Sequence, residues 1–184
     1  MVCGACLARP PRYDAVLAAF AYAFPVDRLL QALKYGGRLA LADWAALALA
    51  TRVAPALRTG PPGPATPLLV PLPLAPARQR ERGFNQAREI ASRLASTLDL
   101  RLASPLHRIH ARPPQAGLPW AERRHNIRGV FAARGVIAGG HYALVDDVMT
   151  TGATLEEAVR VLKQAGAARV ECWVVARTLP PRQS

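Results

Sequence analysis

The segment that decides the fold is Ala143-Leu144-Val145-Asp146-Asp147-Val148-Met149-Thr150-Thr151-Gly152-Ala153-Thr154. Its apolar beginning predicts a buried strand over residues 142–148. The apolar positions that follow recur with helical spacing and predict a helix over residues 154–165: Leu155, Ala158, Val159 and Leu162. The loop between this strand and this helix is expected at the edge where open α/β sheets bind their ligands.

The side chains of this segment suit both parts of a sugar phosphate. Asp146 and Asp147 end the strand, where carboxylates can accept hydrogen bonds from sugar hydroxyls or help to hold a magnesium ion. A phosphate suits the hydroxyls and backbone N–H groups of Thr150, Thr151, Gly152, Ala153 and Thr154. Thr154 and Glu157 have the spacing of a capping box. Either half alone is equally typical of a solvated edge or a plain turn, but the joined pattern predicts a phosphate site.

The rest of the chain predicts an α/β fold with a mostly parallel sheet flanked by helices, because strands and helices alternate. Further strands are expected over residues 13–24, 68–72, 100–103, 129–134 and 169–176, and further helices over residues 26–35, 39–54 and 84–98. A linker rich in proline and glycine over residues 55–67 suggests a soft boundary. We therefore expect a small appendage (1–12), an N-terminal strand and helices packed on the core (13–60), and a main domain (61–184).

Composition limits the class of protein. The formal net charge is +12, and it is nearly all arginine, since the only lysines are Lys34 and Lys163. Arginine suits phosphate or nucleic acid, although codon bias explains such a composition equally well. The apolar stretch 39–57 is interrupted by Asp43 and Arg52, which favours a buried helix over a membrane span. Three cysteines suit a reducing compartment, so we expect a cytoplasmic protein without membrane insertion.

The segment from Ala143 to Thr154 resembles the motif with which type I phosphoribosyltransferases bind 5-phosphoribosyl-1-pyrophosphate (PRPP). Other segments resemble the ComF family of competence and GntX-like proteins: Leu33-Lys34-Tyr35 with Gly37, Arg80-Glu81-Arg82-Gly83-Phe84-Asn85-Gln86, Pro114-Gln115, and the run from Glu122 to Phe131. The resemblance covers nearly the whole chain. It implies a phosphoribosyltransferase-like fold in which Asp146 and Asp147 contact the ribose and the loop binds the 5-phosphate.

Two arginine-rich segments gain an interpretation from this resemblance. Residues 73–83 form an expected basic loop after the strand 68–72, facing the same edge, so its arginines are candidates for the pyrophosphate: Arg78, Arg80 and Arg82. Residues 105–128 are expected to form a long loop, and its part 108–128 resembles the flexible hood that closes over PRPP. The candidate contacts of this hood to phosphate or nucleic acid are Arg108, Arg112, Arg123, Arg124 and Arg128. The alternative for both is a solvated basic surface.

Cys3-x-x-Cys6 has zinc-ligand spacing, and similar family members carry a four-cysteine zinc finger at this end. This sequence has one such pair, Cys3 and Cys6, which is half of a zinc site. Three explanations are open: the protein begins upstream of Met1, this member has lost the zinc finger, or another chain supplies the remaining zinc ligands. Cys172 is expected to be buried as a small apolar residue.

Two functional hypotheses follow. In the first, the chain transfers the phosphoribosyl group of PRPP to a nitrogen acceptor with the help of magnesium, by displacement of pyrophosphate. In the second, it keeps the fold without turnover and binds single-stranded DNA and competence partners.

Overall fold

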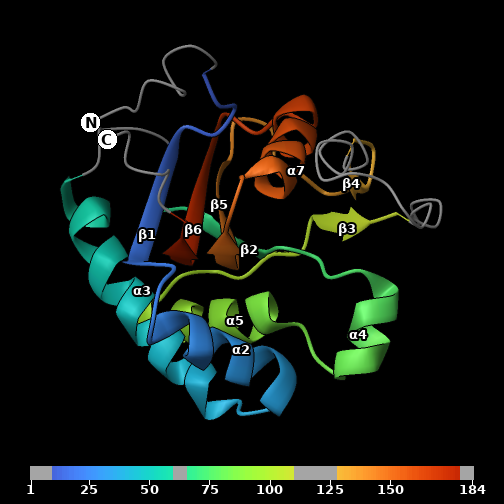
Figure 1. The fold of residues 1–184 in the computed structure, drawn as a ribbon. Helices are drawn as coiled ribbons and strands as arrows, with labels where there is room; N and C mark the ends of the chain where they lie inside the picture. The colour runs from blue at the N-terminus through green and yellow to red at the C-terminus, as the bar shows by residue number, and fades with distance from the viewer. Residues whose placement is uncertain (1–9, 60–65, 110–127, 179–184) are drawn as a thin grey trace, which may run out of the picture.

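A computed structural model describes residues 10–59, 66–109 and 128–178 (Figure 1). The described strands of the main sheet lie in the order β1-β6-β5-β2, and every neighbouring pair is parallel. Their bounds are β1 Ala15–Ala21, β2 Leu68–Pro71, β5 His141–Met149 and β6 Arg169–Arg177. The predicted mostly parallel sheet is confirmed, and the four strands predicted for it lie within three residues of their expected bounds. Strand β5, which carries the two acids, lies inside the sheet between β6 and β2.

Helices cover both faces of this sheet (Figure 1). Helices α2 (Val26–Gly36), α3 (Ala40–Thr59) and α5 (Gln86–Leu98) pack on one face, and α7 (Ala153–Gln164) packs on the other. Alternate strand residues divide between the two cores, because side chains of a strand point to opposite faces. Val145 and Trp173 face the first core, whereas Leu144 and Cys172 face the second. Cys172 is fully buried, as predicted.

Helix α3 is long and apolar enough to cross a membrane by length and composition, a test that the core helices of many proteins also pass. Here one stripe of it is buried against β1, β6 and α5: Ala42, Ala45, Ala46, Leu49 and Val53. The helix also continues through Pro55 to Thr59, so the linker predicted to start at Pro55 starts later. The neighbouring Ala54, Ala56 and Leu57 are good helix formers, which offsets part of the cost of one proline.

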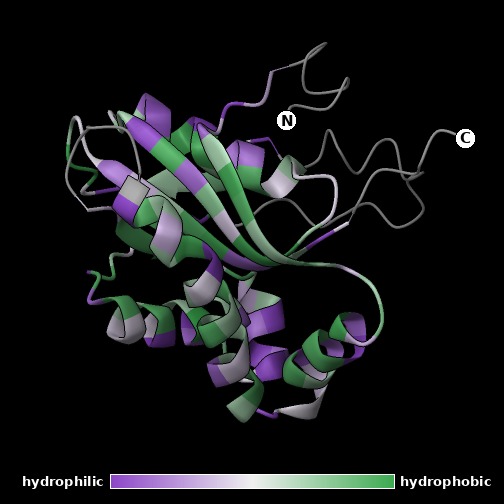
Figure 2. Ribbon diagram, turned by 90° about the vertical axis from the view of Figure 1, so that its left-hand side faces the viewer, coloured by the Kyte–Doolittle hydropathy of each residue, from purple (hydrophilic) through white to green (hydrophobic). Residues whose placement is uncertain are grey.

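The predicted basic loop 73–83 is wrong in part, because Pro76–Arg82 forms helix α4. Proline suits the first turn of a helix, and Gly83, with a φ of +80°, ends it in the left-handed conformation. Helix α5 begins two residues later than predicted, and Asn85 is its N-cap, accepting the N–H of Ala87 at 3.0 Å. Figure 2 shows that hydrophobic and hydrophilic residues are interspersed along the helices.

A second, two-stranded sheet lies beside the first. Strands β3 (Leu106–Arg108) and β4 (Phe131–Ala133) pair antiparallel, so the strand predicted over 129–134 is confirmed, and the loop predicted over 105–128 begins instead as a strand. The strand predicted over 100–103 is wrong: only one isolated bridge, between Leu69 and Leu102, forms there. Phe131 is buried in the core under α7, which brings this small sheet close to the end of β5.

Candidate functional site

The end of β5, the following turn and the start of α7 enclose a small hollow of about 80 Å³. It is lined by Asp146, Val148, Met149, Thr150, Thr151, Gly152, Ala153, Thr154 and Leu155. Clefts for drug-sized ligands measure about 300–1,000 Å³, so this hollow has room for a single chemical group of a ligand and not for a whole ligand of that size. The structure therefore brings Asp146 and the five predicted phosphate-binding residues together around one hollow.

Gly152 forms the turn that shapes this hollow. Its φ is +77°, a left-handed conformation that residues with a Cβ rarely adopt. A Cβ at this position would also lie 2.6 Å from Cε of Met149, so a side chain has no room unless Met149 moves. The backbone conformation therefore favours glycine here, and a side chain would in addition displace the flexible end of Met149.

The first turn of α7 supplies donors for an anion. The N–H of Ala153 donates to Oγ1 of Thr151 over a long 3.4 Å. Within the described part of the chain, the N–H groups of Thr154 and Leu155 have no acceptor, as is usual at a helix N-terminus. The side chains of Thr150 and Thr151 are exposed beside them. Free N–H groups, hydroxyls and the positive end of the helix dipole make this turn suitable for a phosphate.

The predicted capping box between Thr154 and Glu157 is wrong. Helix α7 begins one residue earlier than predicted, with Gly152 as its N-cap, so Glu157 lies too far along the helix to reach the N-cap. The Glu157 carboxylate instead accepts hydrogen bonds from Arg160 at 2.6 Å and from the N–H of Gly129 at 2.7 Å. The bond from Arg160 is the main cause that lowers the pKa of Glu157. Glu157 thus connects helix α7 to Gly129, which lies just before β4.

The residue after β6 fastens the other side of the loop. The N–H of Thr178 donates to the carbonyl of Met149 at 3.0 Å, and its hydroxyl donates to the carbonyl of Thr150 at 3.1 Å. Thr178 was not predicted from the sequence, because no local pattern links it to a loop 28 residues earlier. Its two hydrogen bonds fix the loop that carries the threonine hydroxyls.

The two acids lie on opposite faces of β5, because consecutive side chains of a strand alternate. Asp146 lines the hollow, and its Oδ1 accepts the N–H of Asp147 at 2.9 Å. Burial, and after it the negative charge of Asp147, raises the pKa of Asp146 well above its ordinary value. A ligand that donates hydrogen bonds or carries positive charge would therefore stabilise the ionised form of Asp146.

Asp147 is buried on the face that α2 and α5 cover. It forms an ion pair with Nζ of Lys34 and accepts a hydrogen bond from Nε2 of Gln86 at 3.4 Å. Lys34 and Gln86 were not predicted as site residues from the sequence. Both belong to the motifs that carry the family resemblance, and that was the available signal. The joint contact of both acids with one ribose stays a prediction.

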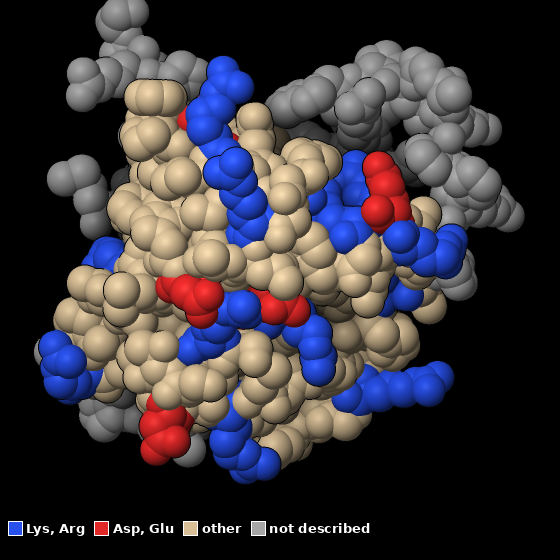
Figure 3. All heavy atoms as spheres, turned by 90° about the horizontal axis from the view of Figure 1, so that it is seen from below, with Lys and Arg blue, Asp and Glu red and all other residues tan. Residues whose placement is uncertain are grey.

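The three arginines predicted for the pyrophosphate lie on α4 and divide into two groups. Arg78 and Arg80 are exposed. Seen from below, the surface of the molecule carries more basic side chains than acidic ones (Figure 3). Arg82 is half-buried, and its Nη1 donates to Oε1 of Gln86 at 2.6 Å. Its guanidinium carbon also lies 5.1 Å from the ring centre of Tyr35. Arg82 therefore contacts the residues around Asp147, whereas the other two face solvent.

Arg108 and Arg128 are the described members of the predicted hood loop. Arg108 lies in β3, with its guanidinium carbon 5.5 Å from the ring centre of Phe131, and Arg128 is exposed. Burial, and after it the positive charge of Arg78, lowers the pKa of Arg108. Arg78 and Arg108 thus lie close enough to repel each other. The remaining candidates lie outside the described residues: Arg112, Arg123, Arg124, Cys3 and Cys6.

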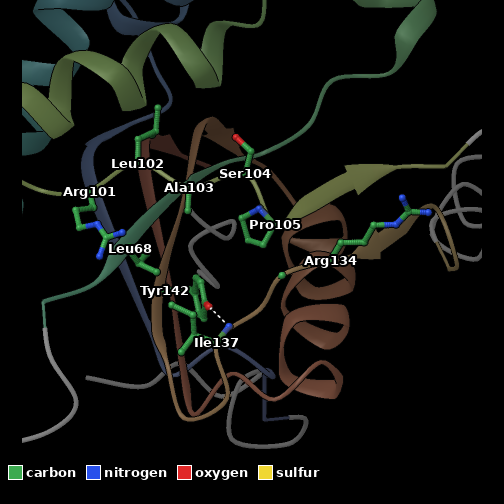
Figure 4. A pocket seen from close by; sticks show the side chains of 10 residues that line it. Leu68, Arg101, Leu102, Ala103, Ser104, Pro105, Arg134, Ile137 and Tyr142 are labelled. Atoms are coloured by element: carbon green, nitrogen blue, oxygen red, sulfur yellow. Dashed lines mark hydrogen bonds between the residues drawn. The ribbon is translucent and has the colours of Figure 1, made fainter.

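Other parts of the described chain are weaker candidates for a site. A larger hollow of about 300 Å³ lies between Arg101, Arg134 and the ring of Tyr142, whose hydroxyl accepts the N–H of Ile137 at 2.7 Å (Figure 4). It lies at the amino ends of β2 and β5, away from the edge where parallel sheets bind ligands. Within the described residues, no group of three His, Cys, Asp or Glu side chains could hold a metal ion. The hollow at Asp146 is therefore the better candidate.

Comparison with known proteins finds similarity over most of the chain. Residues 81–182 match the family model described as "Phosphoribosyl transferase domain". The chain is 35% identical over 179 residues to "DNA utilization protein YhgH" of Salmonella typhi, covering 96% of this chain and 78% of that protein. It is 31% identical over 179 residues to "Competence protein F" of Haemophilus influenzae, covering 95% of this chain and 78% of that one.

Solved structures show a more distant likeness. TT1426 from Thermus thermophilus is 18% identical, with a TM-score of 0.45 over 78% of this chain and 85% of that one. An allosteric regulatory enzyme of purine biosynthesis is 21% identical, with a TM-score of 0.42 over 73% of this chain and 26% of that one. At these values the family match carries the assignment.

Proposed function

We propose that the chain binds PRPP or another ribose 5-phosphate. It belongs to the family of proteins with a phosphoribosyl transferase domain, and it is related to competence protein F and DNA utilization proteins. The observation that carries the proposal is the hollow at the end of β5. It combines the free N–H groups of Thr154 and Leu155 with the carboxylate of Asp146 at its lip. The 5-phosphate is placed at the N–H groups and the ribose hydroxyls at Asp146.

We extend the proposal to transfer of the phosphoribosyl group. The bond from C1 of the ribose to pyrophosphate breaks, a bond from C1 to a nitrogen acceptor forms, and the nitrogen proton passes to solvent. Asp146 would stabilise positive charge that develops on the sugar. The positive charge of Arg78 contributes to the lowered pKa of Arg108, so an anion near both would be favourable, and this supports them as candidate contacts of the pyrophosphate.

Magnesium belongs to this proposal as an ion that arrives with PRPP. A magnesium ion in such sites is held by one or two carboxylates together with the phosphates of the substrate and water. Asp146 fits that role, because its side chain lines the hollow. The hydrogen bond from the N–H of Asp147 to its Oδ1 holds the carboxylate in this orientation. The ion would neutralise charge on the leaving pyrophosphate.

A second candidate function is the binding of single-stranded DNA without turnover. The observations that favour it are the net charge of +12 and the exposed arginines of α4, Arg78 and Arg80. The names of the relatives concern DNA utilization and competence. An affinity for single strands that falls steeply with salt and does not change when PRPP is added would favour this function.

The test is a calorimetric titration with PRPP and magnesium, and separately with ribose 5-phosphate. We expect both to bind the wild type and Asp99→Asn, a change of an exposed acid at the far end of α5. We expect at least a tenfold loss of affinity in Asp146→Asn, which corresponds to about 1.4 kcal/mol. Equal affinities in the two variants would contradict the proposal. Release of pyrophosphate over time, measured with candidate nitrogen bases, would separate transfer from binding alone.

A further inference from the structure

Tyr35 is an exposed aromatic residue beside the ion pair between Lys34 and Asp147. It is 75% exposed and lies near the end of α2, next to Lys34, which pairs with Asp147. Single exposed aromatic side chains are common on protein surfaces and need no explanation by themselves. Tyr35 differs because the guanidinium of Arg82 covers its ring at 5.1 Å, while most of the residue stays open to solvent.

A closed circuit of contacts fixes this aromatic ring relative to the sheet. Arg82 stacks on Tyr35 and donates to Gln86 at 2.6 Å, Gln86 donates to Asp147 at 3.4 Å, and Asp147 pairs with Lys34, the chain neighbour of Tyr35. Gln86 and Asp147 are both buried, at 6% and 3% exposure. Most of this circuit is thus out of solvent, while the ring at its end is open. A platform that is held before the ligand arrives costs less ordering on binding.

We propose that Tyr35 and Arg82 form a stacking platform for an unpaired nucleobase. This inference rests on the proposed function, since the platform is tied to Asp147, the chain neighbour of the Asp146 at which we place the ribose, and would hold the nitrogen acceptor of the transfer or the base of a single strand. A planar ring with nitrogen atoms stacks well on a phenol ring and on a guanidinium plane. The basic side chains of Arg78 and Arg80, on the same helix as Arg82, suit the phosphates of a base that belongs to a nucleotide or a strand.

The test compares ligands that differ only in the base. The first pair is ribose 5-phosphate and adenosine 5′-monophosphate. The second pair is a short thymidine oligonucleotide and an abasic oligonucleotide of the same length. For Tyr35→Leu we expect an unchanged affinity for ribose 5-phosphate and for the abasic strand. We expect a loss of about 5- to 150-fold for at least one base-bearing ligand, the range found for removal of an aromatic stacking partner.

Two further variants sharpen the result. Tyr35→Phe keeps the ring and is expected to bind base-bearing ligands as the wild type does. Phe24→Leu changes another exposed aromatic residue, 81% exposed, and is expected to change no affinity. Unfolding curves identify any variant that is not folded. If Tyr35→Leu is not folded, the comparison of Tyr35→Phe with the wild type decides: a loss of affinity in Tyr35→Phe would point to the hydroxyl and contradict stacking.

The outcomes separate the possible sources of the base. A loss with adenosine 5′-monophosphate alone points to the base of a single nucleotide as the stacked group, and a loss with the thymidine strand alone points to single-stranded nucleic acid. Equal losses with ribose 5-phosphate and the abasic strand, or no loss with any ligand, would overturn the platform. If the wild type binds no ribose 5-phosphate, the proposed function fails, and the strand arm still decides the fate of the platform.

Discussion

Gly152 shows how one residue can be constrained by both backbone and space. Its positive φ and the close approach of Met149 act separately, and the chain offers a control that has only one of these features. Gly135 has a φ of +65°, and a Cβ there would meet nothing within 4 Å. A comparison of the two positions separates backbone strain from lost space.

We predict that Gly135→Ala lowers the free energy of unfolding by about 1–2 kcal/mol, the cost of a left-handed alanine, and keeps ribose 5-phosphate binding. Gly152→Ala is expected to cost at least as much and to weaken that binding, because the added Cβ also displaces Cε of Met149, which lines the same hollow. Urea unfolding and calorimetry measure the two effects. Retained binding in Gly152→Ala would show that this turn does not shape the ligand site.

The buried ion pair between Lys34 and Asp147 is predicted to stabilise the fold. Lys34→Met leaves a buried carboxylate without its cation, and breaking a buried pair in this way costs about 3–5 kcal/mol. The double variant Lys34→Met with Asp147→Asn is expected to recover a large part of this loss in urea unfolding. Additive losses in the two single variants would contradict a direct interaction between these side chains.

At the scale of elements, Asn85 joins the start of α5 to the end of β2. Its side-chain oxygen caps the N–H of Ala87 at 3.0 Å, and its Nδ2 donates to the carbonyl of Leu72 at 3.1 Å. We predict that Asn85→Ala lowers the free energy of unfolding by about 1–2 kcal/mol. Ser96→Ala, on the exposed side of the same helix, is the control and is expected to stay within about 0.5 kcal/mol of the wild type.

The amino ends of β5 and β6 are joined by a network around Glu171. Burial by itself would raise the pKa of Glu171, but the close contact with His141 and the hydrogen bonds from Trp173 and Arg169 outweigh it and lower the pKa to about 2. The carboxylate therefore stabilises the fold above its unfolded pKa of about 4.3, and this contribution is lost as the pH falls toward 2.

We predict that the free energy of unfolding of the wild type falls by about 3 kcal/mol more than that of Glu171→Gln between pH 5 and pH 2. Asp43→Asn, a change of an exposed ion pair with Arg93, serves as the comparison for a surface carboxylate. Urea unfolding at a series of pH values gives both slopes. Parallel curves for the wild type and Glu171→Gln would rule out a depressed pKa.

At the scale of the whole molecule, local patterns predicted more than distant contacts did. The strand, loop and helix around Asp146 follow one another in the sequence, so their residue types were sufficient to predict the fold class and that these residues meet at one place. Phosphate binding at this hollow stays a prediction. The family expected from the motifs is confirmed. The pairing of Lys34 with Asp147 joins residues far apart in the chain, and no periodicity of either segment indicates it.

The errors in the predicted elements also have physical reasons. Residues 76–82 were predicted as a loop because of their charge, yet Pro76 at the first turn and Gly83 at the end favour a short helix. The capping box failed because the backbone of Gly152 ends the turn one residue earlier than the threonine pattern suggested. In both cases a glycine conformation set the boundary, and side-chain chemistry alone did not reveal it.

The most direct test of the central claim is a crystal structure of the protein with ribose 5-phosphate. We predict the phosphate within hydrogen-bond distance of the N–H groups of Thr154 and Leu155, and a ribose hydroxyl on the carboxylate of Asp146. An empty hollow, with the ligand held elsewhere such as between Arg101 and Arg134, would contradict this claim.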